Sequence, residues 1–180
     1  MEQDFKNERS KTIFCAKLID ELFLYAEWDE YGIINKEGGK LRKCKDTFTY
    51  PIHPDLRAAF KKLDAHLAGI CDELKAKEII KVIDKYRADQ FKFVGKGDER
   101  NAVLITGGKR TMHGFVSLVT PTQTFTTSKY HSISELELIT EELCSEIELY
   151  IGAKKIGIMP QMKMDFDGDL NKKPEDTGIS

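Results

Sequence analysis

Apolar residues recur every three or four positions in two stretches of the chain, and each stretch predicts an amphipathic helix. The first helix is expected to begin at Pro54 and Asp55, because proline has no amide to leave unpaired and aspartate complements the helix dipole. It is expected to run to about Leu74, and residues 75–86 either continue it or form a second helix. Its apolar positions are Leu56, Phe60, Leu63, Leu67, Ile70 and Leu74.

The other amphipathic helix is predicted over residues 133–150. Ser134 and Glu137 have the spacing of a capping box, and Ile133 and Leu138 have the spacing of a hydrophobic staple around it. Its polar positions carry glutamates and no lysine or arginine, which is typical of a solvated face that also repels nucleic acid. Its apolar stripe is Leu136, Ile139, Leu143, Ile147 and Tyr150.

Runs of β-branched and aromatic residues predict strands before and between the two helices. Residues 12–28 indicate one long bent strand or two strands broken near Asp20 and Glu21, with a helix as the competing interpretation. Residues 35–40 indicate a loop around two glycines, and residues 41–50 a short strand. Further strands are expected at residues 91–94, 102–106, 115–120 and 123–127.

The order of these elements predicts the fold class. Strands, helix, strands and helix in succession indicate an α+β fold with a mostly antiparallel sheet and two or three helices. Gly107 and Gly108 stand between apolar segments and predict a hairpin-like turn there. Residues 1–157 are expected to form a single domain, and residues 158–180 a polar C-terminal tail.

Composition limits the number of domains, the kind of partner and the compartment that the sequence allows. A chain of 180 residues with 41% hydrophobic residues suits one globular domain with a core of ordinary size. The formal net charge of -2 means that any anionic partner must be recognised by a local basic patch. There is no apolar run of about 18 residues that would predict a membrane helix. Four separate cysteines without a CxxC pair favour reduced, mostly buried thiols in a cytosolic protein.

A basic segment with interleaved aromatics is the first candidate for chemistry. Single-stranded nucleic acid needs cations that reach phosphates and rings that stack on bases. Residues 90–131 supply Phe91, Phe93, Phe115, Phe125 and Tyr130 for stacking, although the same rings equally fit a core beside a solvated basic edge. The candidate nucleic-acid or phosphate-binding residues are Lys92, Lys96, Arg100, Lys109, Arg110 and Lys129.

Within that segment, Lys109 and Arg110 follow the two glycines and are the first choice for a phosphate contact, with a plain basic turn as the alternative. Other chemistry is not indicated. His66 falls on the first helix's apolar stripe, as a packed core histidine does. Asp165, Asp167 and Asp169 alternate like calcium ligands but lack the glutamate of the calcium loop. We therefore expect no catalytic residue, no metal and no cofactor.

Several stretches resemble an uncharacterised family of small bacteriophage and prophage proteins. They are residues 51–56 and 63–67, residues 105–110 and 114–121, and residues 146–155, which together cover about half the chain. The family has no assigned activity, so the resemblance implies no catalytic residues. It implies a phage setting, and with it the cytoplasm of a bacterial host, often in company with replication and recombination genes.

The tail carries a second resemblance. Gln161, Met162, Met164 and Phe166 resemble the hexapeptide with which bacterial proteins dock on the replicative sliding clamp, with methionine where leucine is commoner. A glutamine at the pocket rim and alternate apolar side chains in a groove suit an extended docking peptide. The same alternation, starting at Ile158, also fits a last strand packed on the domain.

These observations predict a non-catalytic, phage-type accessory protein of DNA replication or recombination. It would bind single-stranded nucleic acid, a sliding clamp or another replication protein, or both kinds of partner. One alternative is a counter-defence protein that sequesters a small nucleotide. Another is a structural or assembly protein without a ligand.

Overall fold

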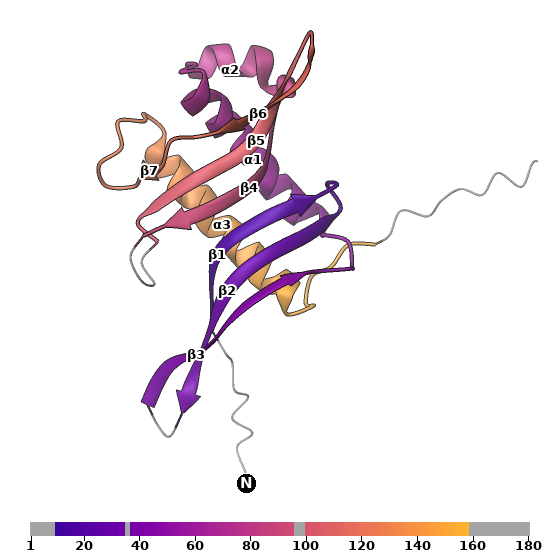
Figure 1. The fold of residues 1–180 in the computed structure, drawn as a ribbon, viewed down its shortest axis with the longest axis vertical. Helices are drawn as coiled ribbons and strands as arrows, with labels where there is room; N and C mark the ends of the chain where they lie inside the picture. Colours follow the sequence, from indigo (N-terminus) through magenta and orange to yellow (C-terminus); the bar gives the residue numbers. More distant parts are fainter. Residues whose placement is uncertain (1–9, 35–36, 96–99, 159–180) are drawn as a thin grey trace, which may run out of the picture.

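An antiparallel sheet forms one layer of the protein (Figure 1). The computed structural model describes residues 10–34, 37–95 and 100–158. Within them the sheet has seven strands in the order β3-β2-β1-β4-β5-β6, and β7 also pairs with β5. The strands are β1 (Ser10–Ile19), β2 (Phe23–Ile34), β3 (Glu37–Thr47), β4 (Tyr86–Val94), β5 (Ala102–Thr111), β6 (Gly114–Val119) and β7 (Gln123–Thr124).

Helices form the second layer. α1 (Pro54–Cys71) and α3 (Ile133–Ile151) pack on one face of the sheet, so the predicted α+β fold is confirmed (Figure 1). α2 (Ala76–Val82) and a single 3₁₀ turn, η1 (Ile83–Lys85), connect α1 to β4. No helix in the described residues is both long and apolar enough to cross a membrane.

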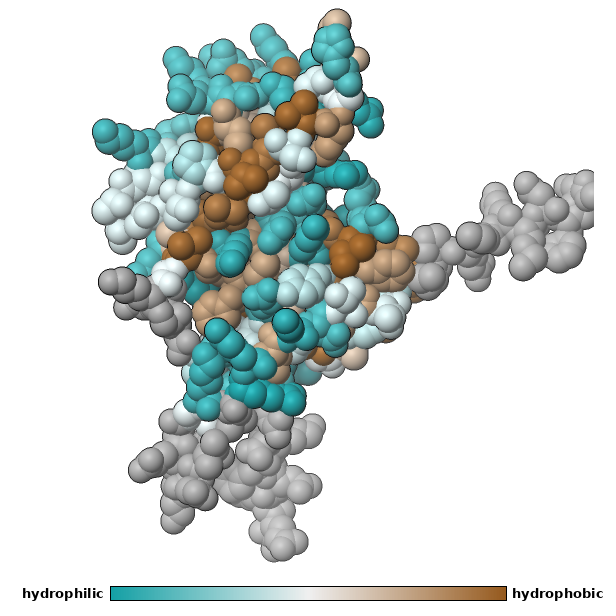
Figure 2. Space-filling model, in the orientation of Figure 1, coloured by the Kyte–Doolittle hydropathy of each residue, from teal (hydrophilic) through white to brown (hydrophobic). Residues whose placement is uncertain are grey.

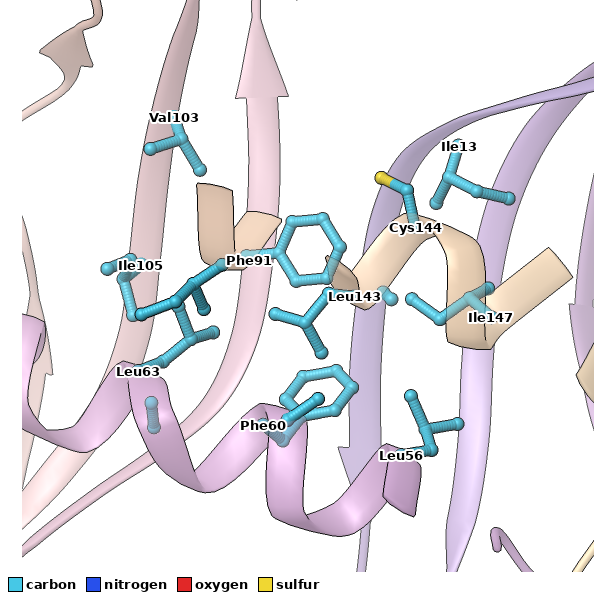
Figure 3. Close-up of a cluster of buried hydrophobic side chains, with 14 of the residues drawn as sticks. Ile13, Leu56, Phe60, Leu63, Phe91, Val103, Ile105, Leu143, Cys144 and Ile147 are labelled. Carbon is cyan, nitrogen blue, oxygen red and sulfur yellow. The ribbon is translucent and has the colours of Figure 1, made fainter. Parts of the chain in front are cut away.

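The core lies between the sheet and the two long helices. Figure 3 shows Phe60 of α1, Phe91 of β4 and Leu143 of α3 converging there, and the Phe60 and Phe91 ring centroids are 5.9 Å apart. Each large side chain buried in this way stabilises the fold by roughly 1.5–3 kcal/mol. The predicted stripes are confirmed for Leu56, Phe60, Leu63, Leu67, Leu136, Ile139, Leu143, Ile147 and Tyr150, which are buried, as is His66. Ile70 and Leu74 of the predicted first stripe are only partly buried against the core.

Two strands and a tight turn replace the single helix that residues 12–28 also suggested. Asp20 and Glu21 have φ angles of 51° and 58°, and the Leu22 N–H donates to the Ile19 carbonyl at 3.0 Å. Two successive positive φ angles define the turn that matches the twist of a hairpin. The predicted break at this dipeptide is therefore confirmed, and the helix interpretation is wrong.

Gly107 and Gly108 do not form the predicted turn, because both lie inside β5. A Cβ on Gly107 would lie 2.1 Å from the Arg87 carbonyl oxygen, and one on Gly108 would lie 2.0 Å from the Phe115 ring. The glycines thus permit close approach of a neighbouring strand and a ring. The chain instead reverses in the two residues between β5 and β6, just before Gly114, which has a φ of 127°.

Three predicted boundaries also need correction. α3 has Ser132 as its N-cap and begins at Ile133, which packs against the core, so Ser134 lies inside the helix. Leu138 is 66% exposed, which rules out the predicted staple. α1 ends at Cys71, before the expected Leu74, and the glycines of the predicted loop at residues 35–40 lie in β3.

Candidate nucleic-acid interface

The face of the sheet that points away from α1 and α3 is here named the open face. Cross-strand partners share a face of a sheet, so strand register identifies its residues. In β4, Phe91 and Phe93 are buried under the helices, whereas Lys92 is exposed, as alternation predicts. One row of partners across the open face runs Thr47, Tyr25, Lys17, Gln90, Thr106 and Val119, from β3 to β6.

Basic side chains outnumber acidic ones on the open face. Two acidic residues accompany them, and both have partners. Asp29 is buried and forms an ion pair with Lys40, and Glu27 accepts a hydrogen bond from the Tyr25 hydroxyl at 2.5 Å. That hydrogen bond raises the pKa of Tyr25 to about 12. The exposed basic residues of the face are Lys17, Lys43, Lys45, Arg87, Lys92 and Arg110.

An apolar stripe crosses the same face beside these cations. Its residues are Val94, Leu104, Val119 and Phe115, and Figure 2 shows hydrophobic surface over β5 and β6. The Phe115 side chain is 53% exposed, and its ring lies 5.4 Å from the Arg87 guanidinium carbon. Apolar and aromatic surface of this kind can stack on bases while neighbouring cations contact phosphates.

Acidic residues gather on α3 instead. α3 carries six glutamates and no basic residue. Five of these glutamates are exposed, and Glu146 is half-buried. Lys62 of α1 donates to both Glu142 carboxylate oxygens at 2.6 Å, which neutralises part of this charge. The α3 surface and the open face therefore differ in charge, and an anionic polymer would be repelled from α3 and attracted to the open face.

The six predicted nucleic-acid residues do not gather on one surface. Lys92 and Arg110 lie on the open face, whereas Lys109, next to Arg110 in a strand, points to the helix side. There Lys109 pairs with Asp72, whose pKa it lowers, and its ammonium lies 5.1 Å from the Tyr86 ring centroid. The proposed joint phosphate contact of Lys109 and Arg110 is therefore not supported by the geometry.

The remaining predicted cations have other surroundings. Arg100 lies 5.2 Å from the Phe93 ring centroid and donates to the Cys144 sulfur at 3.3 Å. Lys129 lines a small cavity beside Tyr130, away from the open face, and Lys96 lies outside the described residues.

Among the predicted stacking rings, Phe115 alone is exposed. Phe91 and Phe93 are core residues, and Phe125 packs edge-on against Phe93 with ring centroids 6.4 Å apart. The Tyr130 hydroxyl is 3.0 Å from His66 Nδ1. The core interpretation is thus correct for Phe91 and Phe93, and Phe125 and Tyr130 also have partners in the folded body.

Four open-face cations were missed by the sequence reasoning. Lys17, Lys43, Lys45 and Arg87 lie outside or at the edge of the basic segment and come from three different strands. Alternation within a strand gives each of them a face, but only the pairing of β1 with β4 puts those faces together. Identifying these four residues as one surface would have required the register between strands that are distant in sequence.

A cleft opens where β1 and β4 separate. The two strands pair over three residues each, 15–17 with 90–92, and then diverge (Figure 1). The space between them, closed on one side by α1 and η1, has a volume of about 880 Å³ and is here named the β1–β4 cleft. Its basic lining residues are Lys17, Arg57, Lys61, Lys85, Arg87 and Arg110.

Two carboxyl groups line the cleft deeply. Asp64 of α1 accepts a hydrogen bond from the Ala88 N–H at 2.7 Å, and burial raises its pKa to about 6. Asp89 is the extra residue of a β-bulge in β4, and burial also raises its pKa. Its Oδ1 is buried without a hydrogen-bond partner among the described residues. An unpaired buried acceptor costs roughly 1–3 kcal/mol.

The cations of the cleft differ in how they are partnered. Arg87 of β4 forms a 2.5 Å ion pair with Glu21, in the turn that follows β1. Arg57, Lys61, Lys85 and Arg110 form no ion pair with another residue of the described ranges. The cleft therefore offers both unpaired cations and an unpaired acceptor.

The described part of the structure adds no support for a metal site or for the docking segment. Residues 10–34, 37–95 and 100–158 contain no cluster of three or more histidine, cysteine or acidic residues suited to a metal ion. Gln161, Met162, Met164 and Phe166 lie outside the described residues, so clamp docking stays a prediction. The chain matches no protein-family model, no curated protein and no solved structure.

Proposed function

We propose that this protein is a non-catalytic accessory protein of phage-type DNA replication or recombination that binds single-stranded nucleic acid on its open face. One observation carries the proposal: exposed cations and an apolar stripe occupy the sheet face that α1 and α3 leave uncovered, while the glutamates of α3 occupy the other layer. The phage and replication setting rests on the sequence resemblance.

The dimensions of the face suit a single strand. Six neighbouring strands about 4.8 Å apart span roughly 24 Å, which accommodates several nucleotides. Lys43 and Lys45 near one end and Arg110 near the other would contact phosphates at the two ends of the bound segment, and bases would lie on the apolar stripe between β4 and β6. A duplex offers no unstacked bases to such a stripe, so single strands are the preferred ligand.

Fluorescence anisotropy with labelled single-stranded oligonucleotides tests this function. Affinity should fall steeply as salt rises, with the logarithmic slope reduced by about 0.7 for each phosphate contact removed. A double variant of the open face, Lys43→Glu with Lys92→Glu, should weaken binding at least about tenfold. The matched control, Lys77→Glu with Lys81→Glu, alters two exposed lysines of α2 and should bind normally.

Two results would overturn the proposal. Unchanged anisotropy at low salt would mean that the open face does not bind single strands. Equal weakening by the open-face and α2 variants would mean that general charge attraction, without a defined surface, accounts for the binding.

We further propose that the tail brings this protein to a sliding clamp. The support is the sequence pattern of Gln161, Met162, Met164 and Phe166 alone. Gln161→Ala and Phe166→Ala should then abolish retention on an immobilised bacterial clamp without lowering the melting temperature. A large fall in melting temperature would instead identify the segment as part of the folded core.

A further inference from the structure

Unpaired cations of the β1–β4 cleft are arranged for an anionic group. Arg57 and Lys61 are four residues apart on α1, so they are neighbours on one side of the helix, and both line the cleft. Lys85 of η1 lines the same cleft. None of the three forms an ion pair with a described residue, so their charges remain available to a phosphate.

The deeper part of the cleft has the opposite character. Asp64 lies one turn beyond Lys61 on α1, and its Oδ1 is occupied by the Ala88 N–H. Asp89 Oδ1 is buried and lacks a donor among the described residues. A bound molecule that places an N–H group here would satisfy this acceptor, as a nucleobase amino group does for an aspartate.

We propose that the β1–β4 cleft binds a nucleotide whose base carries an exocyclic amino group. The phosphate lies against Arg57, Lys61 and Lys85, and the amino group donates to Asp89. The volume of about 880 Å³ falls within the range of small-molecule sites. This inference does not depend on the open face, because its phosphate cations belong to the helix layer.

A nucleotide fits this lining better than a simple ion does. A bare phosphate would leave Asp89 Oδ1 without a donor, and a divalent cation would leave Arg57, Lys61 and Lys85 without an anionic partner. The aromatic and aliphatic lining residues Leu18, Ile83 and Phe115 supply apolar surface for the base and sugar. The same chemistry could come from a free nucleotide or from one nucleotide of a bound strand.

Cytidine and uridine monophosphate separate amino-bearing from amino-lacking bases, because uracil presents an acceptor where cytosine presents an amino donor. Thermal shift with each nucleotide measures free-nucleotide binding, since a ligand that binds only the folded state raises the melting temperature. Anisotropy with oligocytidine and oligothymidine strands of equal length measures recognition within a strand. Asp89→Asn and the double variant Arg57→Ala with Lys61→Ala test the two ends of the site.

Cytidine monophosphate should raise the melting temperature more than uridine monophosphate does. Asp89→Asn should remove or reverse that preference, because an amide can donate to uracil. The Arg57 and Lys61 variant should weaken both nucleotides, and Lys77→Glu on α2 should change neither. Circular dichroism of each variant shows that it has folded.

A shift with free cytidine monophosphate identifies a free nucleotide as the ligand. No shift, together with tighter binding of oligocytidine that Asp89→Asn abolishes, identifies a nucleotide of the strand. Absence of any cytosine preference in both assays overturns the inference. Failure of oligonucleotide binding alone would overturn the open-face function and leave the cleft site standing if free cytidine monophosphate still binds.

Discussion

The Asp64 carboxylate on α1 accepts a 2.7 Å hydrogen bond from the Ala88 backbone N–H on β4. Ala88 lies beyond the three residues of β4 that pair with β1, so no neighbouring strand supplies an acceptor on that side. A helix side chain thus replaces the missing strand partner. The β1–β4 cleft can exist because this amide is satisfied without closing the sheet.

Removal of that acceptor should destabilise the fold. Asp64→Ala leaves the Ala88 N–H buried and unpaired, and we expect the free energy of unfolding to fall by about 1–3 kcal/mol. Asp64→Asn keeps an oxygen acceptor and should retain the bond. Urea denaturation of both variants checks this expectation. An alanine variant as stable as the asparagine variant would show that the hydrogen bond contributes little.

The Asp64 carboxyl should also give stability a pH dependence. Its pKa is about 6 in the folded protein against an ordinary value of 3.8, so the folded state binds the proton more tightly. Stability from this group is therefore greatest below pH 4 and declines as pH rises to about 6, by at most roughly 3 kcal/mol.

The comparison with Asp64→Asn isolates this effect, because other carboxyls such as Asp72, with a lowered pKa, contribute the opposite slope. Above pH 6 the asparagine variant should be the more stable protein, and its advantage should shrink towards pH 4. Melting curves across this range measure the difference. A constant difference at every pH would contradict a raised pKa at Asp64.

Gly107 should tolerate no side chain. A Cβ there would lie 2.1 Å from the Arg87 carbonyl oxygen and 2.8 Å from Leu67 Cδ2, so β4 or α1 would have to move. We expect Gly107→Ala to lower the free energy of unfolding by about 1–3 kcal/mol or more, measured in urea. Gly39→Ala is the matched control in β3, where a Cβ would meet nothing within 4 Å.

Thiol labelling should distinguish the four cysteines, all of which are free. Burial raises the pKa of Cys144 to about 12 and also raises that of Cys15, and both side chains are buried. Iodoacetamide reacts with the thiolate, so mass spectrometry should find the half-buried Cys44 and Cys71 modified before Cys15 and Cys144. Burial also raises the pKa of Cys71, which should slow its modification. Rapid modification of Cys144 in the folded protein would contradict its placement.

Local patterns predicted the features that depend on neighbouring residues. Helical spacing identified the buried faces of α1 and α3, and alternation put Phe91 and Phe93 opposite Lys92. Asp20 and Glu21 were recognised as a break because a turn is a local structure. These features need no knowledge of the rest of the chain.

Features that depend on distant pairing were not predictable in the same way. Gly107 resembles a turn residue until the closeness of Arg87 is known, and Lys17 joins Lys92 on one face only through the pairing of β1 with β4. The β1–β4 cleft has the same origin, since it reflects where that pairing stops. The paired residues of β1 and β4 are about 75 positions apart in the sequence, so no local window contains both partners.

The short β1–β4 contact also divides the sheet into two meanders, each continuous in sequence: β1 to β3 from Ser10 to Thr47, and β4 to β6 from Tyr86 to Val119. Each meander closes only short loops, whereas three residue pairs join the two across a long stretch of chain. Short loops close at lower entropic cost, so we expect each meander to assemble before their junction forms. The fold thus has a natural seam along which two cooperative folding units meet, with α1 and α3 holding them together.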